Sequence, residues 1–423
     1  MKLMSTSTAV NDSFMPAANW RDGLPVLMTG GCVVREPQLS DASPLLEALA
    51  HEEVTRFLPD TPQTIPQFEW FIARIQRERR AGRCLCFTIV PNEPGRPVGL
   101  IQIRPRESSG TTAEWGFAVG RDYWGQRLFG KSARLVVDYL FRQTEINRLE
   151  ARVLLHNGRA NRALEKLGAV VEGILRKSFI TRWQSADQVL WALVREDWVA
   201  KQAGPVYVSK APLVRAPEEV AHATLVADVP PSLLSGLPAL RGEALRMREV
   251  EPRDASDLLR MFEDLYVTRF LPPPPQTVGE FEQFINWSRR QRAAGECACF
   301  VVEPDETRAV SGFFQLRRLD PTFQTAEWGF AIASSCWGTG LFNRCAQRLL
   351  EFAFGQLGVQ RLEARVPLSN RRAAAALRKL GAIREGRLRR SFLLGDECLD
   401  DAMWAIVVDD WTARRGGEST ASR

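Results

Sequence analysis

The sequence aligns with itself at a constant displacement of 213 residues. The string VTRFLP occurs at 54–59 and again at 267–272, and AEWGFA occurs at 113–118 and again at 326–331. The same displacement pairs RLEARV at 148–153 with 361–366, KLGA at 166–169 with 379–382, and Trp198 with Trp411. Solenoid proteins repeat every few tens of residues, whereas this repeat is far longer and has no gaps. It therefore predicts a duplicated domain.

The length of the chain agrees with two domains. Its 423 residues exceed the usual size of a single hydrophobic core. The repeat predicts an N-terminal extension at 1–30, a first domain at 31–200 (copy 1), a linker at 201–243, a second domain at 244–413 (copy 2) and a C-terminal tail at 414–423. Six prolines between Pro205 and Pro238 and the weak periodicity around them are typical of a linker of limited stiffness.

Composition and charge exclude several classes of protein. A chain with 45% hydrophobic and 25% charged residues is globular rather than disordered or fibrous. The net charge of +6 suits a small anionic ligand, but it is too modest and dispersed to predict nucleic-acid binding. The first 22 residues lack the apolar core of a secretory signal, and no membrane segment follows. We expect a cytoplasmic protein that binds neither nucleic acid nor membrane.

The cysteines and histidines do not form a recognisable metal or nucleophile motif. None of the eight cysteines lies in a CxxC pair, and Cys84, Cys86, Cys297 and Cys299 fall in strand-like segments. We interpret them as small core residues in a reducing compartment. The three histidines occupy positions that do not match between the copies. We therefore predict no metal, and chemistry that rests on other groups.

Hydrophobic periodicity gives the order of elements within each copy. In copy 1 it predicts a helix that begins at Asp41 and further helices at 66–81, 128–142 and 159–167. Strands are expected at 32–35, 84–90, 98–103, 112–119, 148–155, 170–176 and 188–194. The order β-α-α-β-β-β-α-β-α-β-β predicts an α/β (α+β) fold, in which helices flank a mixed, mostly antiparallel sheet.

A turn rich in glycine follows the strand of each copy that contains Trp-Gly-Phe. In copy 2 the segment Cys336 to Phe342 reads CWGTGLF and leads into a long amphipathic helix. Free N–H groups in the first helical turn and the positive end of the helix dipole favour an anion such as phosphate. Two glycines in a turn are common, so a plain connection between strand and helix is the alternative.

Several ordered motifs together resemble the GCN5-related N-acetyltransferase (GNAT) superfamily. In copy 2 they are WGTGLF at 337–342, RLEARV at 361–366, Asn370, KLGA at 379–382 and EGRLR at 385–389. They are most similar to the branch that acetylates the N-terminal alanine of ribosomal proteins, and the element order matches. The resemblance covers about 170 residues of each copy and implies tandem acyl-CoA N-acyltransferase folds.

The resemblance implies an acetyl-CoA site between the fourth and fifth strands of each copy. The pantetheine would pair with the backbone of one strand, and the pyrophosphate would lie over the turn. The implied residues of copy 2 are Phe330, Ala331, Ile332, Gly338, Thr339, Gly340, Leu341, Phe342 and Asn370. Those of copy 1 are Phe117, Ala118, Val119, Gly125, Gln126, Arg127, Leu128, Phe129, Asn157 and Asn161.

The two copies depart from the family pattern at different positions. Copy 1 has Arg127 where copy 2 has Gly340, and a Cβ there disfavours positive φ and could obstruct the phosphate, although a guanidinium could also pair with it. Phe129 and Phe342 stand where the family commonly has a small residue. Copy 2 has Ala374 in place of Asn161. Asn157 and Asn370 are equally well explained as helix N-caps.

Transfer to an amine needs a group that accepts the amine proton. Glu114 and Glu327 precede Trp-Gly-Phe, where family members often carry a general base that acts through water. The alternative is an ion pair with an arginine at the end of the sheet. Glu172 and Glu385 are second choices. The family's tyrosine acid is replaced by Leu164 and Leu377, so no general acid is assigned.

Two functional hypotheses result. The first is an N-acetyltransferase that transfers acetyl from acetyl-CoA to a primary amine by direct attack, with copy 2 as the surer catalyst. Its acceptor would be a protein N-terminus or a small-molecule amine. The second is a protein that binds or senses acyl-CoA, or a scaffold, in which one or both copies have lost turnover. Arg127 and the absent tyrosine motivate it.

Overall fold

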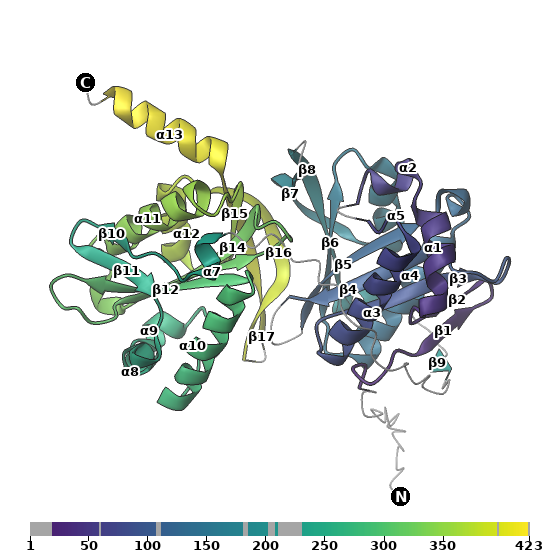
Figure 1. The fold of residues 1–423 in the computed structure, drawn as a ribbon, viewed down its shortest axis with the longest axis horizontal. Coiled ribbons are helices and arrows are strands. Elements are labelled where there is room, and N and C mark those ends of the chain that lie inside the picture. The colour runs from purple at the N-terminus through teal and green to yellow at the C-terminus, as the bar shows by residue number, and fades with distance from the viewer. Residues whose placement is uncertain are drawn as a thin grey trace, which may run out of the picture. The chain divides into compact units, whose positions relative to one another are not determined.

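The computed structural model describes residues 19–58, 61–106, 111–180, 185–201, 208–209, 231–395 and 397–421. The chain forms two compact units. Unit 1 comprises residues 1–151, 163–168 and 193–217, and unit 2 comprises residues 152–162, 169–192 and 218–423. The division therefore differs from that of the repeat, because two segments of copy 1 belong to unit 2. Figure 1 labels the elements of both units.

The sheet of unit 1 has the strand order β9-β1-β2-β3-β4-β5-β6. All neighbours are antiparallel except β5 and β6, which are parallel. The strands are β1 (Val26–Thr29), β2 (Cys32–Arg35), β3 (Leu85–Pro91), β4 (Gly99–Pro105), β5 (Thr112–Val119), β6 (Arg148–Leu154) and β9 (Val208–Ser209). Strand β6 crosses the unit boundary after Ala151.

The helices of unit 1 bury apolar faces that the sequence pattern predicts. Helix α3 begins after Thr64, whose hydroxyl accepts a hydrogen bond from the Gln67 N–H, and it buries Phe68, Ile72 and Ile75. These side chains pack with those of helix α1 and strand β3 in one core cluster. The helices are α1 (Ala42–Leu49), α2 (Glu52–Thr55), α3 (Ile65–Arg80), α4 (Leu128–Gln143) and α6 (Arg195–Lys201); α5 (Gly158–Leu167) is divided between the units.

The sheet of unit 2 has the strand order β10-β11-β12-β13-β14-β15-β17-β16-β7-β8. Again a single neighbouring pair, β14 with β15, is parallel. The strands are β10 (Leu240–Gly242), β11 (Leu245–Glu249), β12 (Cys297–Pro304), β13 (Gly312–Arg318), β14 (Thr325–Ile332), β15 (Arg361–Pro367), β16 (Ile383–Leu394), β17 (Glu397–Val407), β7 (Val170–Ile180) and β8 (Ser185–Val194).

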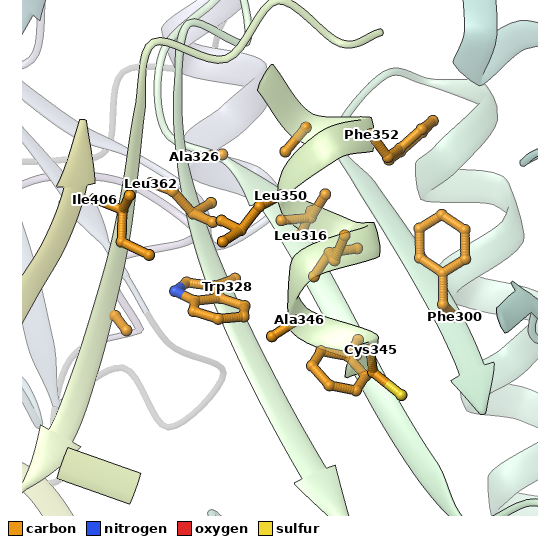
Figure 2. Packing of buried hydrophobic residues seen from close by; sticks show 14 of the residues in the cluster. Phe300, Leu316, Ala326, Trp328, Cys345, Ala346, Leu350, Phe352, Leu362 and Ile406 are labelled. Atoms are coloured by element: carbon orange, nitrogen blue, oxygen red, sulfur yellow. The ribbon is translucent and has the colours of Figure 1, made fainter. Parts of the chain in front are cut away.

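Helices cover both faces of the unit 2 sheet (Figure 1). Helices α11 and α12 pack on one face, where Ala346 and Leu350 lie against Trp328 and Leu362 (Figure 2). Helices α8 and α10 pack on the other face. The helices are α7 (Pro231–Leu234), α8 (Ala255–Phe262), α9 (Leu265–Thr268), α10 (Val278–Ala293), α11 (Leu341–Gly355), α12 (Arg371–Lys379) and α13 (Val408–Ala421).

Strands β7 and β16 meet within unit 2 at two glycines. Gly173 pairs with Gly386, and a Cβ on Gly386 would lie 2.5 Å from the Glu172 carbonyl oxygen. Beside this contact, the Glu172 carboxylate accepts a hydrogen bond from Arg389 Nε at 2.9 Å, and Glu385 accepts one from Arg176 Nε at 2.8 Å.

These contacts bear on the second choices for a general base. The side chains of Glu172 and Glu385 are each only 2% exposed, and Glu385 also accepts hydrogen bonds from the buried Arg361. Both carboxylates are therefore engaged between strands, and their catalytic role stays a prediction.

The predicted fold class is confirmed, and the predicted strands and helices occur in the predicted order in both copies. Each copy also has an unpredicted short helix, α2 or α9, and a final helix, α6 or α13. Several elements lie wholly or partly in segments that the sequence assigned to connections. Strand β1 lies within the expected extension at 1–30, helix α13 continues through the expected tail as far as Ala421, and the expected linker contains β9, α7 and β10. Most of the predicted linker, at 202–207 and 210–230, lies outside the described residues.

We expect Gly386→Ala to destabilise the protein, because the added methyl group would meet rigid backbone rather than a movable side chain. Overpacking of this kind costs about 1–3 kcal/mol in the free energy of unfolding. Urea unfolding monitored by circular dichroism measures it. Gly279→Ala, where nothing lies within 4 Å of the added carbon, is the matched control. Equal stability of the two variants would contradict the close contact.

Candidate active site

The central strand of unit 2 separates from its parallel neighbour partway along its length. Strand β14 pairs with β15 through Thr325, Ala326 and Glu327, opposite Arg361, Leu362 and Glu363. The pairing stops there, although β14 continues to Ile332. Backbone N–H and C=O groups of the last residues of β14 therefore face a gap on the β15 side and can bind an extended ligand. We call this gap the wedge.

A turn with left-handed backbone closes the far end of the wedge. Trp337 Nε1 donates a hydrogen bond to the Ile332 carbonyl at 2.9 Å, which fixes the start of the turn. Gly338 and Gly340 adopt φ values of 82° and 80°. Helix α11 begins at Leu341, whose N–H donates a hydrogen bond to the Thr339 hydroxyl at 3.3 Å, and its N-cap residue, Gly340, has no side chain. Its first-turn N–H groups and dipole make the turn suitable for a phosphate.

Unit 1 contains a turn of the same form. Strand β5 pairs with β6 only through Thr112–Glu114, and Trp124 Nε1 donates to the Val119 carbonyl at 2.8 Å. Gly125 has a φ of 78°, and Arg127 adopts a φ of 59° just before α4. Arginine thus takes the left-handed conformation that glycine takes in copy 2. The positive φ that a Cβ disfavours is thus adopted, at a strain of about 1–2 kcal/mol for a non-glycine residue.

Aromatic side chains fill the space between each separating strand and the following helix. The Phe330 and Phe342 ring centroids lie 4.6 Å apart, and the Phe117 and Phe129 centroids lie 4.1 Å apart. Trp328 packs against both rings of the copy 2 pair. The phenylalanines that replace the family's small residue therefore belong to a packed aromatic cluster in each copy.

The two predicted bases occupy equivalent positions, at the last residue pair before the wedge opens. Glu327 pairs with Glu363 in the strand register, and Glu114 pairs with Glu150. The Glu327 carboxylate accepts a hydrogen bond from Arg317, and its second oxygen lies 3.6 Å from Arg365 Nε.

Glu114 is held in a similar way but is more exposed. Its carboxylate accepts a hydrogen bond from Arg106 Nη1 at 2.7 Å. The side chain of Glu114 is 38% exposed, against 15% for Glu327. The predicted alternative, an ion pair with arginine, is thus present in both copies, and the catalytic role stays a prediction.

The asparagines of the later helix make local hydrogen bonds. Asn370 Oδ1 accepts from the Ala373 N–H at 3.1 Å, and Asn157 Oδ1 accepts from the Ala160 N–H at 3.2 Å. Both residues therefore act as helix caps, while their contact with pantetheine remains a prediction. Asn161 accepts a hydrogen bond from Trp191 Nε1 at 2.8 Å and donates to the Leu154 carbonyl at 3.1 Å.

The sequence did not indicate two further residues near the wedge. The Arg372 guanidinium, at the start of α12, lies 3.5 Å from the Trp337 ring centroid. This contact joins helix α12 to the turn, so the two elements enclose the same end of the wedge. Trp404 of β17 lies directly opposite Ala364, the first β15 residue beyond the pairing with β14. No sequence motif includes either side chain.

Other classes of site receive no support from the described residues. That part of the chain contains no cluster of three or more His, Cys, Asp or Glu side chains that could hold a metal ion. None of its helices combines the length and apolar character needed to cross a membrane. Leu164 and Leu377, at the positions of the family's tyrosine, are fully buried.

Comparison with known proteins gives both the class of the protein, an N-acyltransferase, and its family. The acetyltransferase (GNAT) domain model matches residues 32–170 and again 244–383. The chain therefore belongs to the GNAT family and contains two such domains in tandem.

Relatives of the chain match one domain at a time. An uncharacterized N-acetyltransferase, p20 of Bacillus licheniformis, is 26% identical over 41% of this chain and 99% of its own length. Spermidine N(1)-acetyltransferase of Escherichia coli is 31% identical over 23% of this chain and 52% of its own length. The structure of Mycobacterium smegmatis RimJ in complex with CoA-disulfide matches at 23% identity and a TM-score of 0.38, over 41% of this chain and 87% of that one.

The cysteines offer a probe of the copy 2 turn. Cys336 directly precedes Trp337 and is partly exposed, as is Cys398, whereas the other six cysteines are buried and burial raises the pKa of the Cys345 thiol to about 12. Because copy 1 has Tyr123 at the equivalent position, Cys336 reports on copy 2 alone.

We expect iodoacetamide to modify Cys336 and Cys398 of the native protein first, because the other six cysteines are buried and out of reach of the reagent. Saturating acetyl-CoA, which has no free thiol, should slow modification of Cys336 severalfold and leave Cys398 unchanged. Peptide mass spectrometry measures both rates in one sample, so Cys398 serves as the internal control. Equal rates at Cys336 with and without acetyl-CoA would show that the turn does not hold the ligand.

Proposed function

We propose that the chain transfers an acetyl group from acetyl-CoA to a primary amine, with copy 2 as the principal catalytic site. The observation that supports this most strongly is the wedge. It brings together the unpaired edge of β14, the N-terminus of α11 and the carboxylate of Glu327 within one unit. An extended thioester with a phosphate at one end fits these three features.

In this proposal the donor lies along the wedge. Backbone groups of Phe330–Ile332 pair with the amides of pantetheine, as an added strand would. The pyrophosphate lies over Gly338–Phe342, where the left-handed glycines allow a close approach and the α11 dipole favours negative charge. In copy 1 the corresponding turn also offers the Arg127 guanidinium to the phosphates.

The proposed chemistry is direct attack. The neutral amine nitrogen forms a bond to the thioester carbonyl carbon, the carbon–sulfur bond breaks, and CoA leaves as a thiolate that takes a proton from water. The Glu327 carboxylate accepts the proton of the amine through a water molecule. Its ion pairs with Arg317 and Arg365 hold it at the point where the strands separate. The same roles fall to Glu114 and Arg106 in copy 1.

The acceptor is a primary amine of one of two kinds. The branch that the motifs resemble suggests a protein N-terminus, and the spermidine acetyltransferase among the relatives suggests a small polyamine. Release of thiol from acetyl-CoA, measured with N-terminal alanine peptides and with polyamines, distinguishes the two.

A second candidate function is binding or sensing of acyl-CoA without turnover. The observation in its favour is that both candidate bases are already engaged by arginines in the described structure. Binding of CoA together with an absence of thiol release across the amine panel would favour it over the enzyme.

We expect Glu327→Gln to lower the rate of acetyl transfer by about 10²-fold or more, because a positioned proton acceptor contributes roughly 10²–10⁴-fold. Glu114→Gln should have a smaller effect if copy 2 dominates. The matched control is Glu296→Gln, which also removes a carboxylate paired with an arginine but lies outside the wedge. Steady-state rates measure all three. An unchanged rate in Glu327→Gln would contradict the proposal that Glu327 is the general base.

We expect isothermal titration with CoA to give two sites per chain, because Arg127 preserves the backbone of the copy 1 turn. Gly340→Arg, which copies this residue into copy 2, should keep both sites and reduce the free energy of unfolding by about 1–2 kcal/mol. Gly355→Arg, at the other end of α11, controls for the added charge. One site in the wild-type chain would contradict the expectation.

A further inference from the structure

Copy 2 contains a buried hydrogen-bond donor that lacks an acceptor. Trp404 is 6% exposed, and within the described chain its indole Nε1 has no hydrogen-bond partner. In copy 1 the equivalent donor, Trp191 Nε1, is bonded to Asn161 Oδ1 at 2.8 Å. Ala374 stands where Asn161 would recur, so copy 2 has lost the acceptor and kept the donor. A buried N–H without a partner is destabilising, which calls for an explanation.

The difference does not come from a change of fold. Trp191 pairs with Val171 in the β7–β8 hairpin, and Trp404 pairs with the equivalent residue, Arg384, in the β16–β17 hairpin. Ala374 packs against the core cluster that contains Trp404. The asparagine-to-alanine replacement therefore removes the acceptor next to an otherwise equivalent tryptophan.

This donor is separated from the wedge by a single strand, β15. Trp404 is opposite Ala364, the first residue of β15 that β14 no longer contacts. Leu362 and Ile406, two residues away on each strand, share its face of the sheet and belong to the same core cluster (Figure 2). Trp404 thus belongs to the α11 and α12 face, on the β15 side of the separation.

We infer that Trp404 Nε1 and the space beside Ala374 form a subsite for an amide carbonyl oxygen of the pantetheine arm in copy 2. The indole N–H can only donate, so its partner is an acceptor, and no charged partner is needed. Pantetheine carries two amide carbonyls along its length. This inference rests on the proposed function, because it places acetyl-CoA in the wedge.

The alternation of side chains separates the amide from the thioester. Glu327 and Trp328 are consecutive in β14 and therefore point to opposite faces of the sheet. Trp328 shares the α11 face with Trp404, so the Glu327 carboxylate faces away from it. A thioester positioned next to Glu327 therefore lies toward one face of the sheet, and Trp404 lies on the other face. The carbonyl that Trp404 meets therefore precedes the thioester in the arm.

In copy 1 the same position is occupied by protein. Asn161 accepts from Trp191 and also donates to backbone carbonyls of Leu154 and Asn157. Its side chain thus takes the place that the ligand carbonyl takes in copy 2. The residue beside the tryptophan, alanine in copy 2 and asparagine in copy 1, would therefore give the two copies different affinities for acetyl-CoA.

Two substitutions test the subsite from opposite directions. Trp404→Phe removes the donor and keeps most of the ring, and Ala374→Asn supplies a protein acceptor in the manner of copy 1. Protection of Cys336 from iodoacetamide, titrated with CoA blocked at sulfur by methylation and with acetyl-CoA, isolates the dissociation constant of copy 2. We expect each variant to weaken both ligands by roughly three- to tenfold. Ala374→Asn should also raise the melting temperature, because it satisfies Trp404.

The matched control is Trp191→Phe, which should leave protection of Cys336 unchanged. Unchanged dissociation constants in both Trp404→Phe and Ala374→Asn would overturn the subsite and leave a buried water as the partner of Nε1. An effect confined to acetyl-CoA would overturn the amide assignment, since only that ligand has the thioester carbonyl. An absence of protection in the wild-type protein would instead refute the proposed function itself.

Discussion

The separation of β14 from β15 after three residue pairs is the constraint on which the candidate site depends. A strand in the middle of a sheet normally has its backbone groups paired on both sides, and here one side is left open from Trp328 to Ile332. The strand can remain extended only if other contacts hold it. The antiparallel ladder with β13, which reaches Ile332, supplies one side, and the Trp337 indole bonded to the Ile332 carbonyl fixes the end.

The aromatic cluster and the ion pairs maintain the separation from opposite faces. Trp328, Phe330 and Phe342 pack on the α11 face, where bulky rings support the strand that β15 no longer supports. On the other face Glu327 joins β14 to Arg317 of β13 and to Arg365 of β15. The ion pairs thus join the two strands at the point where they separate, and the aromatic cluster supports β14 beyond that point. This explains why phenylalanine is accommodated where smaller residues are common in the family.

The sequence predicted those parts of the molecule that local pattern determines. Apolar spacing placed α3 and β5 almost to the residue, and the order of elements agreed with the family. It could not predict which arginine holds Glu327, because ion pairs join strands that are distant in sequence. It also could not show that Arg127 adopts left-handed backbone, since that choice depends on the surrounding turn. The change from Asn161 to Ala374 was visible, but the tryptophan that it leaves unpaired was not.

The assignment of β7 and β8 to unit 2 changes how the duplication should be understood. Residues 169–192 belong to copy 1 by sequence and to unit 2 by contact, where Gly173 lies against Gly386. A chain cut in the linker would yield a C-terminal fragment that exposes the edge of β16 and leaves Arg389 and Glu385 without their copy 1 partners. Exposed strand edges promote aggregation. The two halves of the repeat are therefore not separable folding modules, because this hairpin of copy 1 completes the sheet of unit 2.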